Sequence, residues 1–332
     1  DALPILDHVG YDYNPRRRDM GYHNIHDRYI ELLDKYGKYK DDIQWHFHPM
    51  SHYKEAHRAG KSYEHSETLY QILSRRIIDR NFFPSVFRAG CVTERPDANW
   101  FLEQWIPFDC SNFAVENENK EQYRDQRNGQ AGDWRRAPSD WRIYHPDFYD
   151  YQKEGGCHRS IGRFLNIVSR YGNITSYEIE KAFQRANEGL PTLLGIFNHD
   201  FRNMGNEIEY FCDLLYDISR KYNNVSFKFA TAKEAFNAVL QNKLSEFDLN
   251  VRLKGNELYV DTIKGCVFGP QPYLAIKTKS GKYIHDNFDF GLDGKSWSYV
   301  FDENMIKFED VDTIGVAAND MCGQVSLKCI KA

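Results

Sequence analysis

Hydrophobic spacing divides the chain into two parts with different periods. Up to about residue 241, runs with apolar side chains at helical spacing alternate with short runs typical of strands. Such an alternation favours parallel α/β architecture. The pattern predicts helices at 22–37, 66–80, 99–105, 175–187, 206–222 and 232–240, and strands at 43–49, 83–88, 106–110, 193–199 and 225–229.

After about residue 242 the helical spacing gives way to short apolar runs separated by turn residues, as at 254–256 and 280–282. This pattern predicts a small antiparallel β-sandwich. We therefore expect an α/β unit at 1–241 and a β-sandwich accessory domain at 242–332. The expected strands of the sandwich are 249–253, 258–260, 273–276, 297–300 and 324–327.

Residues 116–140 are the polar exception within the first part and predict an exposed loop. One arginine pair, Arg135 with Arg136, lies near the end of this segment, and a second pair, Arg159 with Arg163, follows it. We expect solvated loops for both pairs, and binding of a nucleotide- or lipid-linked phosphate is the alternative.

Composition narrows the possible functions. The 332 residues carry a formal charge of −5, and this negative balance lacks the electrostatic footprint of a general nucleic-acid binder. No run of eighteen apolar residues occurs, which excludes a membrane span. The 7 cysteines are scattered without a CxxC pair, a usage typical of a reducing compartment, so we expect a cytoplasmic location.

Aromatic residues make up 15% of the chain. An aromatic ring can stack on the apolar face of a sugar, although most aromatic side chains fill cores. Trp45 and Tyr53 flank a histidine-rich strand end and are the predicted substrate-binding aromatics. For Trp105, Trp134 and Trp141, core packing is the favoured interpretation.

Histidines gather where predicted strands end. His48 and His52 lie four residues apart, a spacing that lets two imidazoles reach one metal ion, and His46 is an additional candidate ligand. Arg88 ends the next predicted strand, and His199 ends a later one. Because ligands of parallel α/β folds bind beyond the carboxyl ends of strands, we expect these side chains to share one site.

These segments resemble motifs of the polysaccharide deacetylase-like superfamily of metal-dependent carbohydrate esterases and amidases. The segment His-Pro-Met-Ser-His at 48–52 is similar to the family's metal-binding motif, with Pro49 in place of a hydroxyl residue. Phe-Arg-Ala-Gly at 87–90 is similar to the arginine motif, and 194–199 is similar to the late Leu-x-x-His motif with altered spacing. The resemblance covers about residues 1–240 and implies a distorted (β/α) barrel.

The resemblance also implies roles for individual residues. His48 and His52 would bind a divalent metal ion, with zinc as the expected ion, and His199 would protonate the leaving group. Arg88 would orient the carboxylate that acts as the base. Asp200, which follows His199, is a further predicted substrate contact.

The family's first motif, a pair of aspartates, has no clear counterpart before His48. Asp7 and Asp12 are the candidates near strand-like sequence, and Asp12 is the predicted catalytic base. Three interpretations stay open: one of these aspartates replaces the motif, the motif lies upstream of Asp1, or the site is degenerate.

We therefore expect a metal-dependent hydrolase that removes an N- or O-acyl group from a saccharide in surface-polysaccharide biosynthesis. The expected partner is the saccharide, including nucleotide- or lipid-linked forms. The main alternative is a non-catalytic carbohydrate-binding protein with a degenerate deacetylase barrel. A glycoside hydrolase would need two carboxylates about 5–10 Å apart, and the sequence offers no clear pair.

Overall fold

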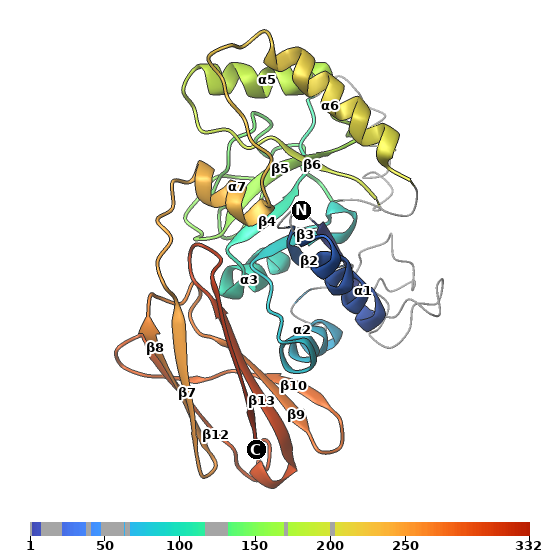
Figure 1. The fold of residues 1–332 in the computed structure, drawn as a ribbon. Helices are drawn as coiled ribbons and strands as arrows, with labels where there is room; N and C mark the ends of the chain where they lie inside the picture. The colour runs from blue at the N-terminus through green and yellow to red at the C-terminus, as the bar shows by residue number, and fades with distance from the viewer. Residues whose placement is uncertain are drawn as a thin grey trace.

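The computed structural model describes residues 2–7, 22–37, 41–47, 63, 67–116, 132–168, 172–199 and 203–332. These residues form a mixed α/β fold with one curled parallel sheet and two antiparallel sheets (Figure 1). The parallel sheet lies in the upper half of Figure 1, and the antiparallel sheets lie below it.

The parallel sheet has six strands in the order β1-β2-β3-β4-β5-β6, each parallel to its neighbours. Sequential order is the order of a singly wound sheet that curls toward a barrel. In the described residues β6 is not paired with β1, so the predicted full (β/α) barrel is not confirmed and the sheet is a half-barrel. The strands are β1 (Ala2–Asp7), β2 (Ile43–Phe47), β3 (Val86–Ala89), β4 (Phe108–Asn112), β5 (Ser160–Asn166) and β6 (Gly195–Phe197).

Helices follow the strands and cover the two faces of the sheet differently. The outer face packs Trp45 and Phe87 against Phe101 of α3, and Ile161 against Ile179 of α5. The inner face carries the alternate side chains, and α7 covers part of it. The helices are α1 (Tyr22–Lys35), α2 (Glu67–Arg80), α3 (Pro96–Trp105), α5 (Ser176–Asn187), α6 (Gly205–Ser219) and α7 (Ala232–Val239).

The antiparallel strands form two four-stranded sheets, in the orders β10-β9-β13-β14 and β11-β12-β8-β7. One apolar cluster joins the two sheets, and Leu258, Val260, Ile276 and Trp297 belong to it. The predicted antiparallel part is thus observed. Its strands are β7 (Asp248–Lys254), β8 (Glu257–Lys264), β9 (Tyr273–Thr278), β10 (Tyr283–Asp286), β11 (Asp289–Phe290), β12 (Ser296–Val300), β13 (Val311–Asn319) and β14 (Val325–Lys331).

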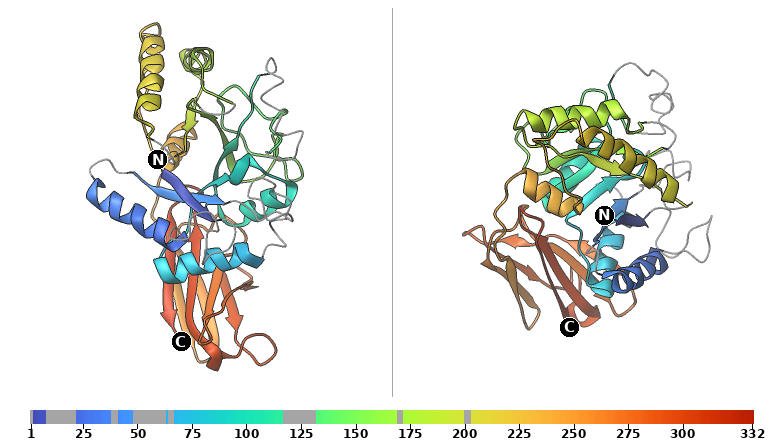
Figure 2. Two further views of the ribbon diagram at one scale, coloured as in Figure 1. Left: turned by 90° about the vertical axis from the view of Figure 1, so that its right-hand side faces the viewer. Right: turned by 45° about the horizontal axis from the view of Figure 1, so that its top comes forward.

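The antiparallel strands pack directly on α2, which lies between them and the parallel sheet (Figure 2). Tyr273 of β9 and Ala317 of β13 belong to the same apolar cluster as Trp105 of α3. The Asn319 side-chain amide donates to the carbonyl oxygens of Pro84 and Trp105 at 2.7 and 2.8 Å. Because one core spans both parts, the division at residue 241 into separate domains stays a prediction.

Two segments differ from the sequence prediction. Residues 225–229 form no strand in the described structure, although their alternation predicts one. Conversely, the sequence does not predict β5, because Arg163 interrupts its apolar pattern. All seven residues of β5 are buried. Arg163, within β5, and Arg159, just before it, are each 0% exposed, so the predicted solvated position of this pair is wrong. Arg135 and Arg136 are exposed, as expected.

No helix among the described residues is both long and apolar enough to cross a membrane.

Candidate active site

Adjacent strands place His46 and Arg88 side by side. The two residues are register partners on β2 and β3. The Nδ1 atom of His46 lies 3.0 Å from the carbonyl oxygen of Arg88. When Nδ1–H donates in this contact, the lone pair of the neutral imidazole lies on Nε2, which is the form that binds a metal ion.

Arg88 links the ends of two strands that are not neighbours. Its side chain is buried, and Nη1 donates to the carbonyl oxygen of Cys110 at 2.5 Å. Its guanidinium carbon lies 3.5 Å from the centre of the Phe197 ring on β6. In a flat sheet β3 and β6 would be about 14 Å apart, three strand spacings. The contact is consistent with the curl of the sheet, and it joins the side chains of β3 and β6 across the inner face.

His199 lies just beyond β6 and is exposed. Its ring centre is 5.9 Å from that of Phe197, the ring that the Arg88 guanidinium also contacts. The Asn198 side-chain amide donates to Glu207 of α6, which ties the end of β6 to this helix. An exposed imidazole at this position can meet a substrate that approaches the strand ends.

Cys110 of β4, whose carbonyl oxygen accepts from Arg88, carries a buried thiol. Burial, followed by the charge of Asp109, raises the pKa of the Cys110 thiol well above its usual value, and Arg88 offsets this only in part. The thiol stays protonated at neutral pH, so a cysteine-based mechanism is disfavoured at this site.

The structure thus places His46 beside Arg88, and it places Arg88 and His199 each beside Phe197. The other predicted site residues, namely Asp12, His48, His52, Tyr53 and Asp200, lie outside the described residues. The part of the chain that the structure describes contains no group of three metal-binding side chains. His46 is therefore the one predicted ligand with a described position, and the zinc site stays a prediction.

Trp45 has a different role from the predicted one. It is 1% exposed, and its ring centre lies 5.5 Å from Phe47 and 5.2 Å from Phe87. A ring enclosed in this way offers no face to a saccharide, so substrate binding by Trp45 is corrected to core packing. Trp105, Trp134 and Trp141 are also buried, as expected.

Sequence reasoning missed a buried charge cluster on the outer side of the sheet. Arg159 forms ion pairs with Asp109 and with Glu94, the latter at 3.4 Å, and all three side chains are 0% exposed. Asn99 of α3 accepts a further hydrogen bond from Arg159. The four residues come from separate segments, and no local pattern in the sequence indicates their association.

The members of this cluster shift one another's pKa values. Burial and the neighbouring Asp109 raise the pKa of Glu94 well above its usual value, against the opposing effect of Arg159. Burial lowers the pKa of the Arg159 guanidinium. The charges of Glu94 and Asp109 outweigh this effect, so the pKa is raised overall. The one buried guanidinium of Arg159 thus faces two carboxyl groups that are also buried. This arrangement fits a structural role.

Comparison of the chain with protein-family models, with curated proteins and with solved structures finds no match. The function must therefore be inferred from the residues of this chain.

Proposed function

We propose that the chain is a metal-dependent hydrolase of the polysaccharide deacetylase type, which removes an N- or O-acyl group from a saccharide in surface-polysaccharide biosynthesis. The observation that carries this proposal is the contact of Arg88 with Phe197. It joins the ends of β3 and β6 on the inner face, next to His46 on β2. The strand β2 leads directly into the segment 48–52, which holds the two predicted metal ligands.

Imidazole nitrogens are a donor set that suits zinc. His48 and His52 would hold the ion, with His46 as an additional ligand. A bound divalent ion lowers the pKa of water and stabilises an oxyanion. The Nδ1–H tautomer that the contact of His46 with the Arg88 carbonyl favours leaves Nε2 as the nitrogen that could bind the ion.

The other residues supply proton transfers and orientation. A carboxylate, with Asp12 as the candidate, would take the proton of the attacking water, and Arg88 would fix the position of that carboxylate. His199 would give a proton to the sugar nitrogen or oxygen as its bond to the acyl carbon breaks. The exposure of His199 supports this role, because the proton donor must reach the substrate.

Metal analysis and an acetate-release assay test the proposal together. The full chain is expected to bind about one zinc ion and to release acetate from N-acetylglucosamine oligomers. His48→Ala and His52→Ala should each abolish both properties, because two imidazole ligands are needed for a stable site. His158→Ala is the matched control, because the His158 side chain is 70% exposed and lies outside the proposed site.

Three results distinguish the possibilities. Absence of bound metal in the full chain would overturn the hydrolase proposal. Bound metal without acyl release from either amide or ester substrates would favour the carbohydrate-binding alternative. Loss of metal in the His158 variant would show that the assay reports folding instead of ligation.

A further inference from the structure

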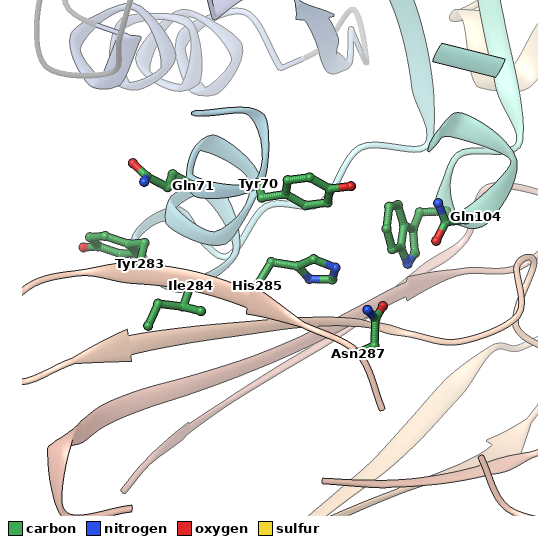
Figure 3. Close-up of a pocket in the computed structure, with 8 residues that line it drawn as sticks. Tyr70, Gln71, Gln104, Tyr283, Ile284, His285 and Asn287 are labelled. Atoms are coloured by element: carbon green, nitrogen blue, oxygen red, sulfur yellow. The ribbon is translucent and has the colours of Figure 1, made fainter. Parts of the chain in front are cut away.

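A second candidate site lies at the junction between the helices and the antiparallel strands. A pocket of about 330 Å³ opens between α2, α3 and β10. It lies on the outer, helical side of the parallel sheet, whereas Arg88 and Phe197 meet on the inner face. The pocket is lined by Tyr70, Gln71, Gln104, Trp105, His285 and Asn287, among others (Figure 3).

Aromatic rings hold His285 in one position within this pocket. Its ring stacks on Tyr70 at 4.9 Å and on Tyr273 at 4.1 Å between ring centres. The Trp105 ring stands perpendicular to it at 5.3 Å. The pocket therefore has rigid aromatic walls, and Figure 3 shows His285, Tyr70, Gln104 and Asn287 around one space.

The polar atoms of the pocket are neutral. The Nδ1 atom of His285 lies 2.9 Å from the carbonyl oxygen of Leu274. Burial lowers the pKa of His285 to about 4, so at neutral pH the uncharged ring presents Nε2 as an acceptor. The Oδ1 atom of Asn287 accepts a hydrogen bond from the Gln271 side-chain amide. The amide nitrogen of Asn287 is thus left to donate to other groups. None of the described lining residues is charged at neutral pH.

The Gln104 amide and the Trp105 indole have hydrogen-bonding groups that a ligand could use. The Gln104 amide nitrogen makes only a long contact, 3.4 Å, to the carbonyl oxygen of Trp100, which leaves Oε1 as an acceptor. The indole N–H of Trp105 is buried and meets no acceptor in the described part of the chain. An unpaired buried donor is unfavourable, so a ligand atom that accepts from it would be stabilised there.

This lining selects a ligand class by exclusion. A phosphate or carboxylate would enter a pocket without a cationic partner, which is costly. A purely apolar ligand would leave the amides and the imidazole unpaired. A ligand with several hydroxyl groups and one apolar face satisfies both the polar atoms and the aromatic walls, and a sugar ring has this form.

The surface of α3 extends the site. Trp100 precedes Gln104 by one helical turn, so both lie on the same face of the helix. Its ring stacks on Phe148 at 5.8 Å, and its indole N–H donates to the Phe148 carbonyl oxygen at 2.8 Å. Phe148 and Tyr149 are 48% and 72% exposed. We define Trp100, Phe148 and Tyr149 as the aromatic platform.

We propose that the junction pocket and the aromatic platform together form an exosite for a neutral oligosaccharide, with one sugar ring in the pocket and a following ring on the platform. The choice of a saccharide substrate chain as the occupant rests on the proposed function. The exosite shares no residue with the predicted metal site.

Binding is measured by calorimetry with N-acetylglucosamine, chitotetraose, cellotetraose and maltotetraose. The background is the full chain with His48→Ala and His52→Ala, so the predicted metal site does not contribute.

Gln104→Ala and Asn287→Ala should each weaken binding of the preferred sugar about tenfold, because each removes one hydrogen bond. Tyr149→Ala should weaken binding of the tetrasaccharide by a similar factor and leave binding of the monosaccharide unchanged. Asn224→Ala, on an exposed residue after α6, is the matched control.

The outcomes separate this proposal from the proposed function. The exosite is overturned when none of these sugars binds at millimolar concentration, or when the three exosite variants bind as well as the control. Acyl release by the full chain would still stand in that case. Binding that depends on Gln104 and Asn287, in a chain that never releases acetate, supports the exosite and contradicts the hydrolase.

Discussion

Arg159 and Arg136 form similar ion pairs in different surroundings. The Arg159 side chain is 0% exposed beside two carboxyl groups that are equally buried. The Arg136 side chain is 63% exposed, and its nitrogen lies 2.6 Å from a carboxylate oxygen of Asp150. Water screens the second pair and not the first, so their contributions to stability should differ strongly.

Arg159→Met should lower the free energy of unfolding by about 3–5 kcal/mol, because Glu94 and Asp109 would lose their cationic partner within the core. Arg136→Met should lower it by no more than about 1 kcal/mol, since the pair is solvated. Urea denaturation followed by circular dichroism measures both. Equal effects of the two substitutions would contradict the structural role of the buried cluster.

At the scale of elements, α7 fills part of the concave inner face. The helix begins with a capping box, in which Thr231 and Glu234 satisfy each other's backbone N–H groups. Phe236 is 0% exposed and stacks on Phe108 at 4.9 Å between ring centres. A side chain at Gly162 of β5 would approach Phe236 to 2.9 Å, so the absence of one allows the helix to lie this close.

Phe236→Ala should lower the free energy of unfolding by about 3–5 kcal/mol, because it leaves a cavity against Phe108. Phe229→Ala is the control: that ring is 60% exposed, and its loss should change stability by about 0.5 kcal/mol or less. Thermal and urea unfolding of both variants provide the measurement. A small effect at Phe236 would mean that α7 does not cover the inner face in solution.

At the scale of the whole molecule, the two parts of the chain are joined by one core. Gly315 of β13 illustrates the fit: a Cβ atom there would lie 2.5 Å from Ile77 of α2. Asn319 donates to two carbonyl groups of the parallel part. With a continuous core, the two parts should unfold together.

Asn319→Ala should therefore lower the free energy of unfolding of the whole chain by about 2–3 kcal/mol, since both carbonyl groups lose their donor. Far-UV circular dichroism and tryptophan fluorescence should still give coincident transitions. Asn304→Ala, at an exposed position, should leave stability unchanged. Two separate transitions would instead show that the parts fold as independent domains.

The order of helices and strands follows from the sequence itself, because hydrophobic periodicity is a local property. The segment 66–80 predicts α2, observed at Glu67–Arg80, and the strand 43–49 predicts β2, observed at Ile43–Phe47. The strand-end rule also predicts that Arg88 and His199 share one site. Both lie close to the Phe197 ring, and the shared site stays a prediction. The predicted ligands His48 and His52 lie outside the described residues, so the same prediction is not tested for them.

Only the tertiary structure decides which side chains are buried. Arg159 is buried because its partners Glu94 and Asp109 lie 65 and 50 residues away, and no local pattern contains that information. Trp45 is enclosed because Phe47 and Phe87 meet it on the outer face of the sheet. The sequence determines which elements can form, because propensity and spacing are local. The fold determines the core and the sites, because burial and charge pairing depend on contacts between distant residues.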